Sequence, residues 1–124
     1  MIDFKNGLFT KLTPIKRPEN VAMVQPILVD GESIIAEYSS VRDFVLFTNK
    51  RIIAVNVQGL SGKKKDFSSL PYSKIQAFSI ETAGTFDLDA ELELYFSGLG
   101  RVKFEFAGSS EITKIGKLIS AHIL

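Results

Sequence analysis

The sequence predicts a mainly β fold, in which about seven antiparallel strands are followed by one C-terminal α-helix. Two apolar runs, rich in β-branched and aromatic residues, flank a tight-turn signal at residues 48–51. Residues 86–96 and 101–106 alternate between apolar and polar side chains, as half-buried strands do. Residues 112–123 instead carry apolar side chains at helical spacing. The length of 124 residues suits one domain built from these elements.

Residues 1–16 are interpreted as an N-terminal arm that precedes a domain at residues 17–124. The arm carries four apolar anchors, namely Phe4, Leu8, Phe9 and Leu12. Because Gly7 within the arm and Pro14 after it disfavour a stable helix, we expect the arm to be loosely held. The alternative is a segment that docks on a neighbouring subunit or on a membrane surface.

A short helix is expected to open the domain, because Pro18 suits the first helical position and Pro26 cannot continue a helix. Asp30-Gly31 is a turn signal. The apolar residues that follow predict a first strand over residues 32–38, with a turn at residues 39–40.

The central hairpin spans residues 42–57. Asn49 tolerates the left-handed conformation that a tight two-residue loop requires. If residues 49–50 form that loop, Phe47 faces Ile52 and the remaining pairs follow in register. Neither strand alternates cleanly between apolar and polar residues, which predicts that both faces of the hairpin are covered.

Two further strands are expected at residues 63–69 and 75–82. The first begins with three lysines, and such charge is typical of an exposed edge strand. The charged residues at positions 42–43 and 50–51 are assigned structural roles at the ends of the central hairpin. A surface ion pair there would contribute about 1 kcal/mol or less.

Residues 86–96 give the clearest alternation in the chain. Even-numbered side chains, Phe86 and Leu88 among them, are predicted to face the core. The opposite face carries the acidic residues Asp87, Asp89, Glu91 and Glu93.

Residues 101–106 alternate in the same phase, so facing residues must have numbers with an even sum. One register pairs Glu93 with Lys103 and Glu91 with Glu105. The other pairs Tyr95 with Lys103 and Glu93 with Glu105. We favour the first because it adds an opposite-charge pair, and it implies a three-residue loop at residues 97–99.

The C-terminal helix is expected to start at Ser109-Ser110-Glu111, which offers a cap and an acidic first turn. Its apolar stripe consists of Ile112, Ile115, Leu118, Ile119 and Ile123. A stripe of this kind must cover another apolar surface, and the open end of a barrel is the surface we expect.

Composition excludes several functional classes. The formal net charge of +1 gives no overall attraction to nucleic acid. Because the chain has no cysteine, disulfides, thiolate nucleophiles and thiolate zinc sites are excluded. The N-terminus lacks the apolar run of a signal peptide, and no segment approaches the roughly 18 apolar residues of a membrane span. We therefore expect a cytoplasmic protein.

Seven motifs occur in the order found in the small bacterial pleckstrin-homology (PH)-like family, which residues 20–124 resemble. They are PILVDGE (26–32), RD (42–43), FTNKR (47–51), QGLSGKK (58–64), PY (71–72), ETAG (81–84) and FDLDAEL (86–92). The resemblance implies a partly open barrel of two antiparallel sheets plugged by the C-terminal helix. It also implies no enzymatic activity and self-association into ring-shaped homo-oligomers.

The candidate chemical sites are weak. Four acidic residues could supply oxygen ligands, but alternate side chains on a straight strand lie about 7 Å apart. We therefore interpret Asp87, Asp89, Glu91 and Glu93 as a solvated face and as a candidate self-association surface. His122 is the sole histidine and has no partners for a metal triad or for nucleophilic catalysis. No catalytic residue, metal or cofactor is predicted.

The basic run Lys63, Lys64 and Lys65 is a candidate contact for anionic lipid headgroups. A phosphate loop is disfavoured here, because a strand rather than a helix follows the glycines. The leading hypothesis is a non-catalytic binding and assembly domain whose partner is itself or another protein. The alternative is a peripheral membrane module that uses these lysines, together with the N-terminal arm.

Overall fold

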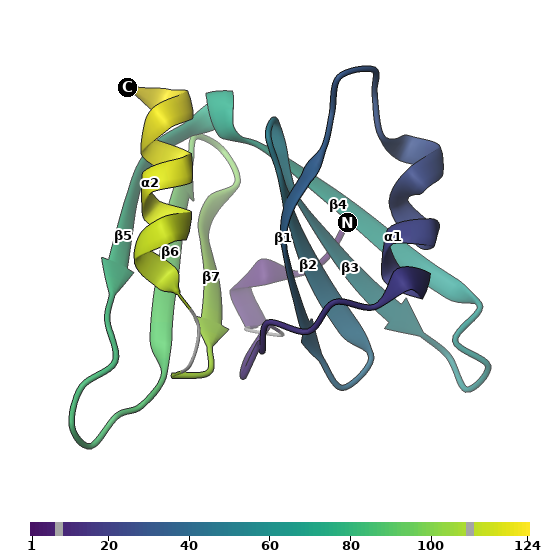
Figure 1. Ribbon diagram of the computed structural model, residues 1–124, viewed down its shortest axis with the longest axis horizontal. Helices are drawn as coiled ribbons and strands as arrows, with labels where there is room; N and C mark the ends of the chain where they lie inside the picture. Colours follow the sequence, from purple (N-terminus) through teal and green to yellow (C-terminus); the bar gives the residue numbers. More distant parts are fainter. Residues whose placement is uncertain (7–8, 109–110) are drawn as a thin grey trace.

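The computed structural model describes residues 1–6, 9–108 and 111–124, and these residues form two antiparallel sheets and two α-helices (Figure 1). The four-stranded sheet contains, in spatial order, β1 (Ile34–Ser40), β2 (Asp43–Thr48), β3 (Arg51–Gln58) and β4 (Lys64–Pro71). The three-stranded sheet contains β5 (Ile75–Glu81), β6 (Ala90–Phe96) and β7 (Gly100–Phe106). The helices are α1 (Pro18–Val24) and α2 (Ile112–Ile123), with 3-10 turns η1 (Phe4–Asn6), η2 (Gln25–Ile27) and η3 (Tyr72–Lys74). The predicted fold class is confirmed, and the two sheets do not close into a complete barrel.

The central hairpin has the predicted register, since Phe47 pairs with Ile52 and Val45 with Ala54. Its loop differs from the prediction: among the described non-glycine residues only Lys11 has a positive φ. The Thr48 hydroxyl oxygen accepts bonds from the backbone N–H groups of residues 50 and 51, each at 3.0 Å. Because this side chain bridges the turn, Asn49 does not need the left-handed conformation.

Both faces of this hairpin are buried, as predicted. One face joins the main core between the sheets, which includes Val45, Phe47, Ile52 and Ala54. The other face packs against α1 in a second core of Val24, Phe44, Leu46, Ile53 and Val55. Burial of a side chain of this size stabilises a fold by about 1.5–3 kcal/mol, so the two cores fix the four-stranded sheet from both sides.

The predicted bounds of the first strand are wrong by two residues. Ser33 leaves the ladder because its N–H donates to the Asn49 side chain (2.8 Å) and its carbonyl accepts the Asn49 N–H (3.0 Å). At the other end, Ser40 still pairs with Asp43, so the turn lies at residues 41–42 rather than 39–40. Ser33 therefore bonds to the side chain and the backbone of Asn49, and the strand begins only at Ile34.

The strand predicted over residues 86–96 begins only at Ala90, and the inward placement of Phe86 and Leu88 is wrong. These side chains are 99% and 65% exposed, in a loop formed by residues 82–89. Within the loop the Gly84 N–H donates to the Asp87 carbonyl (2.6 Å), and the Asp89 N–H donates to the Asp87 carboxylate (3.1 Å). These local bonds satisfy the backbone without a strand partner.

The favoured register of the last hairpin is confirmed: Glu93 pairs with Lys103, Glu91 with Glu105, and residues 97–99 form the loop. The charged contacts, however, are diagonal. Lys103 reaches Glu91 at 3.2 Å, and Arg101 reaches Glu93 at 3.3 Å. The diagonal contact places Lys103 beside Glu91, which faces the like-charged Glu105.

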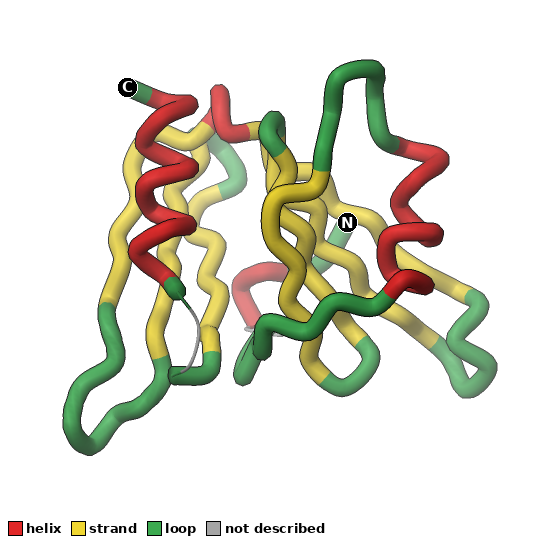
Figure 2. Tube along the Cα trace, viewed as in Figure 1, coloured by secondary structure: helices red, strands yellow, loops and turns green. Residues whose placement is uncertain are grey.

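The interpretation of residues 1–16 as a loosely held arm is wrong for the described part, and the Leu8 anchor lies outside the described residues. Phe4, Phe9 and Leu12 are buried in the main core. Leu12 bonds to β7 through its N–H, which donates to the Glu105 carbonyl (3.0 Å), and Thr13 exchanges two backbone bonds with Ser39 of β1. The segment thus joins the facing edges of the two sheets, as its path between β1 and β7 shows (Figure 2). A buried segment cannot also serve as a membrane anchor.

Helix α2 lies against the three-stranded sheet (Figure 1). Ile112, Ile115 and Ile119 are buried in the main core, which confirms the predicted stripe. A Cβ on Gly116 would overlap the Ile80 side chain, so glycine permits the close approach of helix and sheet. Glu111 occupies the cap position without a side-chain cap bond, and the Ser109-Ser110 cap lies outside the described residues.

Candidate functional site

No cluster of side chains that could hold a metal ion is present in the part of the chain that the structure describes. Within residues 1–6, 9–108 and 111–124, no three His, Asp or Glu side chains are grouped to hold a metal ion. His122 lies on the exposed side of α2, where its Nδ1 is 2.8 Å from the Leu118 carbonyl oxygen and its ring is 5.0 Å from that of Tyr72. These are contacts of a structural histidine at a helix edge.

The motif residue Arg51 forms a buried clasp with Glu32. Its guanidinium donates two bonds to the Glu32 carboxylate, both at 2.9 Å, and a third to the Ile27 carbonyl at 2.6 Å. The side chains of Glu32 and Arg51 are 0% and 18% exposed. The arginine bonds lower the pKa of Glu32 from 4.5 to about 2, against the opposing effect of burial. The expected surface ion pair is therefore a buried one, and the sequence analysis missed Glu32 as the partner.

The rest of the clasp joins three segments of the chain. The Thr48 hydroxyl donates to the Glu32 carboxylate at 2.8 Å. The Tyr72 hydroxyl donates to the Thr48 carbonyl at 2.7 Å, and burial raises the pKa of Tyr72. The clasp fixes η2, the central hairpin and the start of η3 together, so it is a structural feature of the four-stranded sheet rather than a binding site.

Charged residues also organise the β3–β4 turn. The Asp43 carboxylate accepts bonds from Asn56 (3.1 Å) and from the Val57 N–H (3.0 Å). The Arg42 guanidinium donates to the Gly59 carbonyl. The structural roles predicted for residues 42–43 agree with these contacts.

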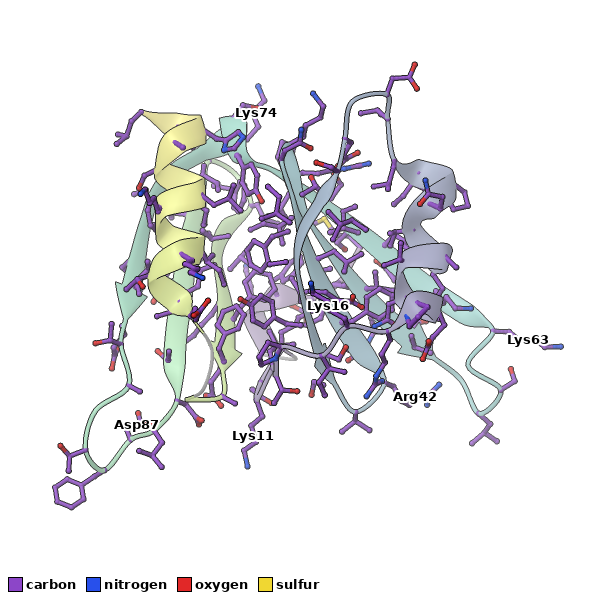
Figure 3. The ribbon with its side chains drawn as sticks, viewed as in Figure 1. Lys11, Lys16, Arg42, Lys63, Lys74 and Asp87 are labelled. Atoms are coloured by element: carbon purple, nitrogen blue, oxygen red, sulfur yellow. The ribbon has the colours of Figure 1, made fainter. Side chains whose placement is uncertain are left out.

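The basic run begins at this turn and continues into the edge strand β4. Lys63 and Lys64 are exposed, and Lys65 is half-buried. None of the three forms an ion pair with any residue in the described ranges. Lys63 projects at one end of the molecule, far from Asp87 at the other (Figure 3). The run remains a candidate contact for an anionic surface.

The four predicted acidic residues fall into two different groups. Asp87 and Asp89 belong to the loop at residues 82–89, whereas Glu91 and Glu93 lie on β6 and pair with Lys103 and Arg101. They do not form one continuous strand face. Asp87 therefore carries charge that no described basic side chain neutralises.

Glu105 on β7 completes an acidic cluster with Asp89 and Glu91. Partial burial raises the pKa of Glu105, and the charges of Asp89 and Glu91 raise it further. The N–H of Lys11 donates to the Glu105 carboxylate and opposes that rise. Glu105 is thus a carboxyl group that the fold makes harder to ionise.

A mainly apolar groove with a volume of about 390 Å³ lies between α1 and β1. It is lined by Lys16, Arg17, Pro18, Val21, Ile34, Ile35, Ala36 and Glu37. The carboxylate of Glu37 faces inward and accepts bonds from the Arg17 N–H and the Asn20 amide, both at 3.1 Å. The side chains of Lys16 and Arg17 form no ion pair with a described residue. Sequence reasoning missed this groove because its two walls are far apart in the chain.

The two-sheet architecture and the C-terminal helix that covers one sheet define a PH-like domain. The model of the bacterial PH domain family matches residues 3–123, and the chain belongs to this family. The chain is similar to the uncharacterized protein YjqA of Bacillus subtilis (strain 168), with 46% identity over 95% of this chain and 96% of the relative.

Solved structures agree with this assignment. A DUF1696 family protein with a pleckstrin-homology domain from Shewanella loihica PV-4 superposes with a TM-score of 0.79, at 37% identity over 93% of this chain and 99% of the other. A pleckstrin homology domain from Shewanella amazonensis SB2B gives a TM-score of 0.67, at 39% identity over 90% of this chain and 91% of the other. In the described part of the chain, no helix is long and apolar enough to cross a membrane.

Proposed function

We propose that this chain is a non-catalytic PH-like assembly domain that forms a ring-type homo-oligomer and presents a protein-binding surface. Family membership supplies the fold but no ligand, because folds of this kind host many functions. No group of three or more His, Asp or Glu side chains that could hold a metal ion occurs in the described ranges, and this supports a binding role over a metal-dependent enzymatic one.

The observation that carries the proposal is the separation of unlike surfaces on one small domain. The loop at residues 82–89 exposes Phe86 beside unpaired Asp87. Unpaired lysines, Lys16 and Lys63 among them, lie elsewhere on the molecule (Figure 3). A ring needs two different complementary patches on each copy, and the acidic loop and the unpaired lysines are unlike surfaces of the kind that a ring requires.

Light scattering of the purified protein tests the proposal. We expect a mass of several protomers at micromolar concentration, which falls as salt is raised because the contacts include charge pairs. A mass of one protomer at all concentrations and at low salt would refute the proposal.

A second function, contact with an anionic membrane surface, is favoured by the β3–β4 turn. Leu60 is fully exposed at this turn, close in sequence to the exposed Lys63 and Lys64. An apolar side chain beside basic ones is typical of interfacial binding, and each lysine contributes about 1 kcal/mol near an anionic bilayer.

Sedimentation with phosphatidylserine vesicles tests this second function. The wild-type protein should sediment at low salt and should be released at high salt. Lys63→Glu combined with Lys64→Glu should abolish sedimentation. Binding that survives this charge reversal would exclude the lysines as the contact.

A further inference from the structure

Phe86 is the most exposed aromatic side chain in the described ranges, at 99%. Leu88 adds a second exposed apolar group at 65%. Two bonds connect residues within the loop that carries them, the Gly84–Asp87 backbone bond (2.6 Å) and the Asp89–Asp87 bond (3.1 Å). At its base, the Leu88 carbonyl oxygen lies so close to Gly108 that a Cβ there would overlap it. Internal bonds of this kind lower the entropy that a loop loses on binding, so the loop is suited to present an aromatic anchor.

The charge of the loop restricts what it can bind. Asp87 and Asp89 flank Leu88, and Glu105 lies beside Asp89. Carboxylates are repelled by anionic bilayers and by nucleic acid, so the anchor needs an apolar hollow with a basic rim.

The groove between α1 and β1 meets both requirements. Its volume of about 390 Å³ exceeds the roughly 150 Å³ cavity that holds a benzene ring. Val21, Ile34 and Ala36 supply apolar walls, and Lys16 and Arg17 supply cationic side chains that form no ion pair with a described acid. The lining also includes Glu37, whose carboxylate already accepts bonds from the Arg17 N–H and the Asn20 amide.

Two other surfaces fit less well. The neighbouring hollow between β1 and α2 includes Glu111, whose carboxylate already pairs with Lys114 at 2.7 Å. The basic run at residues 63–65 lies at the start of an edge strand, where Lys63 and Lys64 are exposed to solvent.

We propose that the loop at residues 82–89 of one copy docks in the α1–β1 groove of a second copy, with Phe86 in the groove and Asp87 beside Lys16. This inference rests on the proposed homo-oligomer and names its two contact surfaces. The loop and the groove of one copy lie apart (Figure 3), so the contact joins copies head to tail.

Light scattering of single variants is the first test. Phe86→Ser should raise the dissociation constant of the assembly about tenfold or more, as expected for an aromatic anchor. Leu60→Ser, a matched exposed apolar residue on another loop, should leave it unchanged. Both side chains are exposed in a single copy, so neither change should alter the melting temperature at concentrations where the wild type is dissociated.

Charge reversal supplies the second test. Lys16→Glu alone and Asp87→Lys alone should each weaken assembly, whereas an equal mixture of the two variants should assemble again. In that mixture each loop meets a groove of opposite charge. Lys63→Glu is the matched control and should assemble as the wild type does.

The outcomes separate the two proposals. A wild-type protein that is monomeric refutes the homo-oligomer and the docking contact with it. An assembled wild type whose mass is unchanged by Phe86→Ser and by Lys16→Glu refutes the docking contact alone. Dissociation by Lys63→Glu but not by Lys16→Glu would also overturn it, because the basic run would then be the receiving surface.

Discussion

Carboxylates near the two sheets lie in opposite electrostatic environments. Just before the four-stranded sheet begins, the side chain of Glu32 is buried and receives two bonds from Arg51. In the three-stranded sheet, Glu105 lies beside Asp89 and Glu91, and its charge is opposed rather than neutralised. The first arrangement uses charge to hold segments together. The second leaves negative charge at the base of an exposed loop, where a basic surface can still meet it.

Removal of Arg51 should have the largest effect on stability. Arg51→Ala leaves the Glu32 carboxylate buried without its partner, and the loss of one member of a buried pair costs about 3–5 kcal/mol. Urea denaturation measures this as a lower transition midpoint. Lys50→Ala, one residue away and exposed, should change stability by less than about 0.5 kcal/mol. Equal effects of the two variants would contradict the clasp.

Next to the three-stranded sheet, which carries the acidic cluster, stability should depend instead on apolar packing. Leu12 is fully buried beside β7, so Leu12→Ala should cost about 2–5 kcal/mol. Ile15→Ala is the control, because Ile15 is 40% exposed and its truncation leaves a smaller cavity. If Leu12→Ala unfolds no more easily than Ile15→Ala, residues 9–13 do not hold the two sheets together.

Acid titration should reveal the clasp, because the lowered pKa of Glu32 fixes the direction in which stability changes with pH. The pKa of Glu32 is about 2 in the folded protein and 4.5 as its ordinary value, so the folded state favours the ionised form. The resulting stability is complete above pH 4.5 and is lost as the pH falls towards 2, with a total of about 3 kcal/mol. Glu32→Gln should flatten this limb of the pH profile. An unchanged limb in the variant would assign acid unfolding to other carboxylates.

Local patterns predicted the parts of the fold that are set by neighbouring residues. The hairpin register at Phe47 and Ile52 and the pairing of Glu93 with Lys103 follow from turn length and side-chain alternation. The ends of β1 and β6 could not be predicted in this way. The start of β1 is set by bonds between Asn49 and Ser33, which are distant in sequence. The start of β6 is set by bonds within the loop at residues 82–89, which apolar alternation does not reveal.

The candidate surfaces were predicted only in part for the same reason. The lysines at the start of β4 and the acidic residues could be identified from the sequence alone. The groove could not be predicted, because Lys16 and Ile35 become neighbours only when residues 13–17 run along β1. The burial of Phe4 and Phe9 also depends on the facing edge of the other sheet.

The smallest expected effect on stability comes from Glu105. Its charge should destabilise the folded protein, whereas the charge of Glu32 stabilises it. The pKa of Glu105 is raised above 4.5, so its ionised form destabilises the folded protein once the pH exceeds the folded-state pKa. Glu105→Gln should therefore stabilise the protein at pH 7, by less than about 1 kcal/mol because the group is partly solvated. Well below pH 4.5 both forms are neutral and the gain should vanish.

Glu93→Gln is the matched control, since Glu93 lies on the same face of the sheet but is paired with Arg101. Its removal should give no gain at neutral pH. Melting temperatures of both variants at pH 7 and pH 3 decide the comparison. If Glu105→Gln is less stable than the wild type at pH 7, the acidic cluster is balanced by contacts comparable to those of Glu32, and the contrast between the two sheets is wrong.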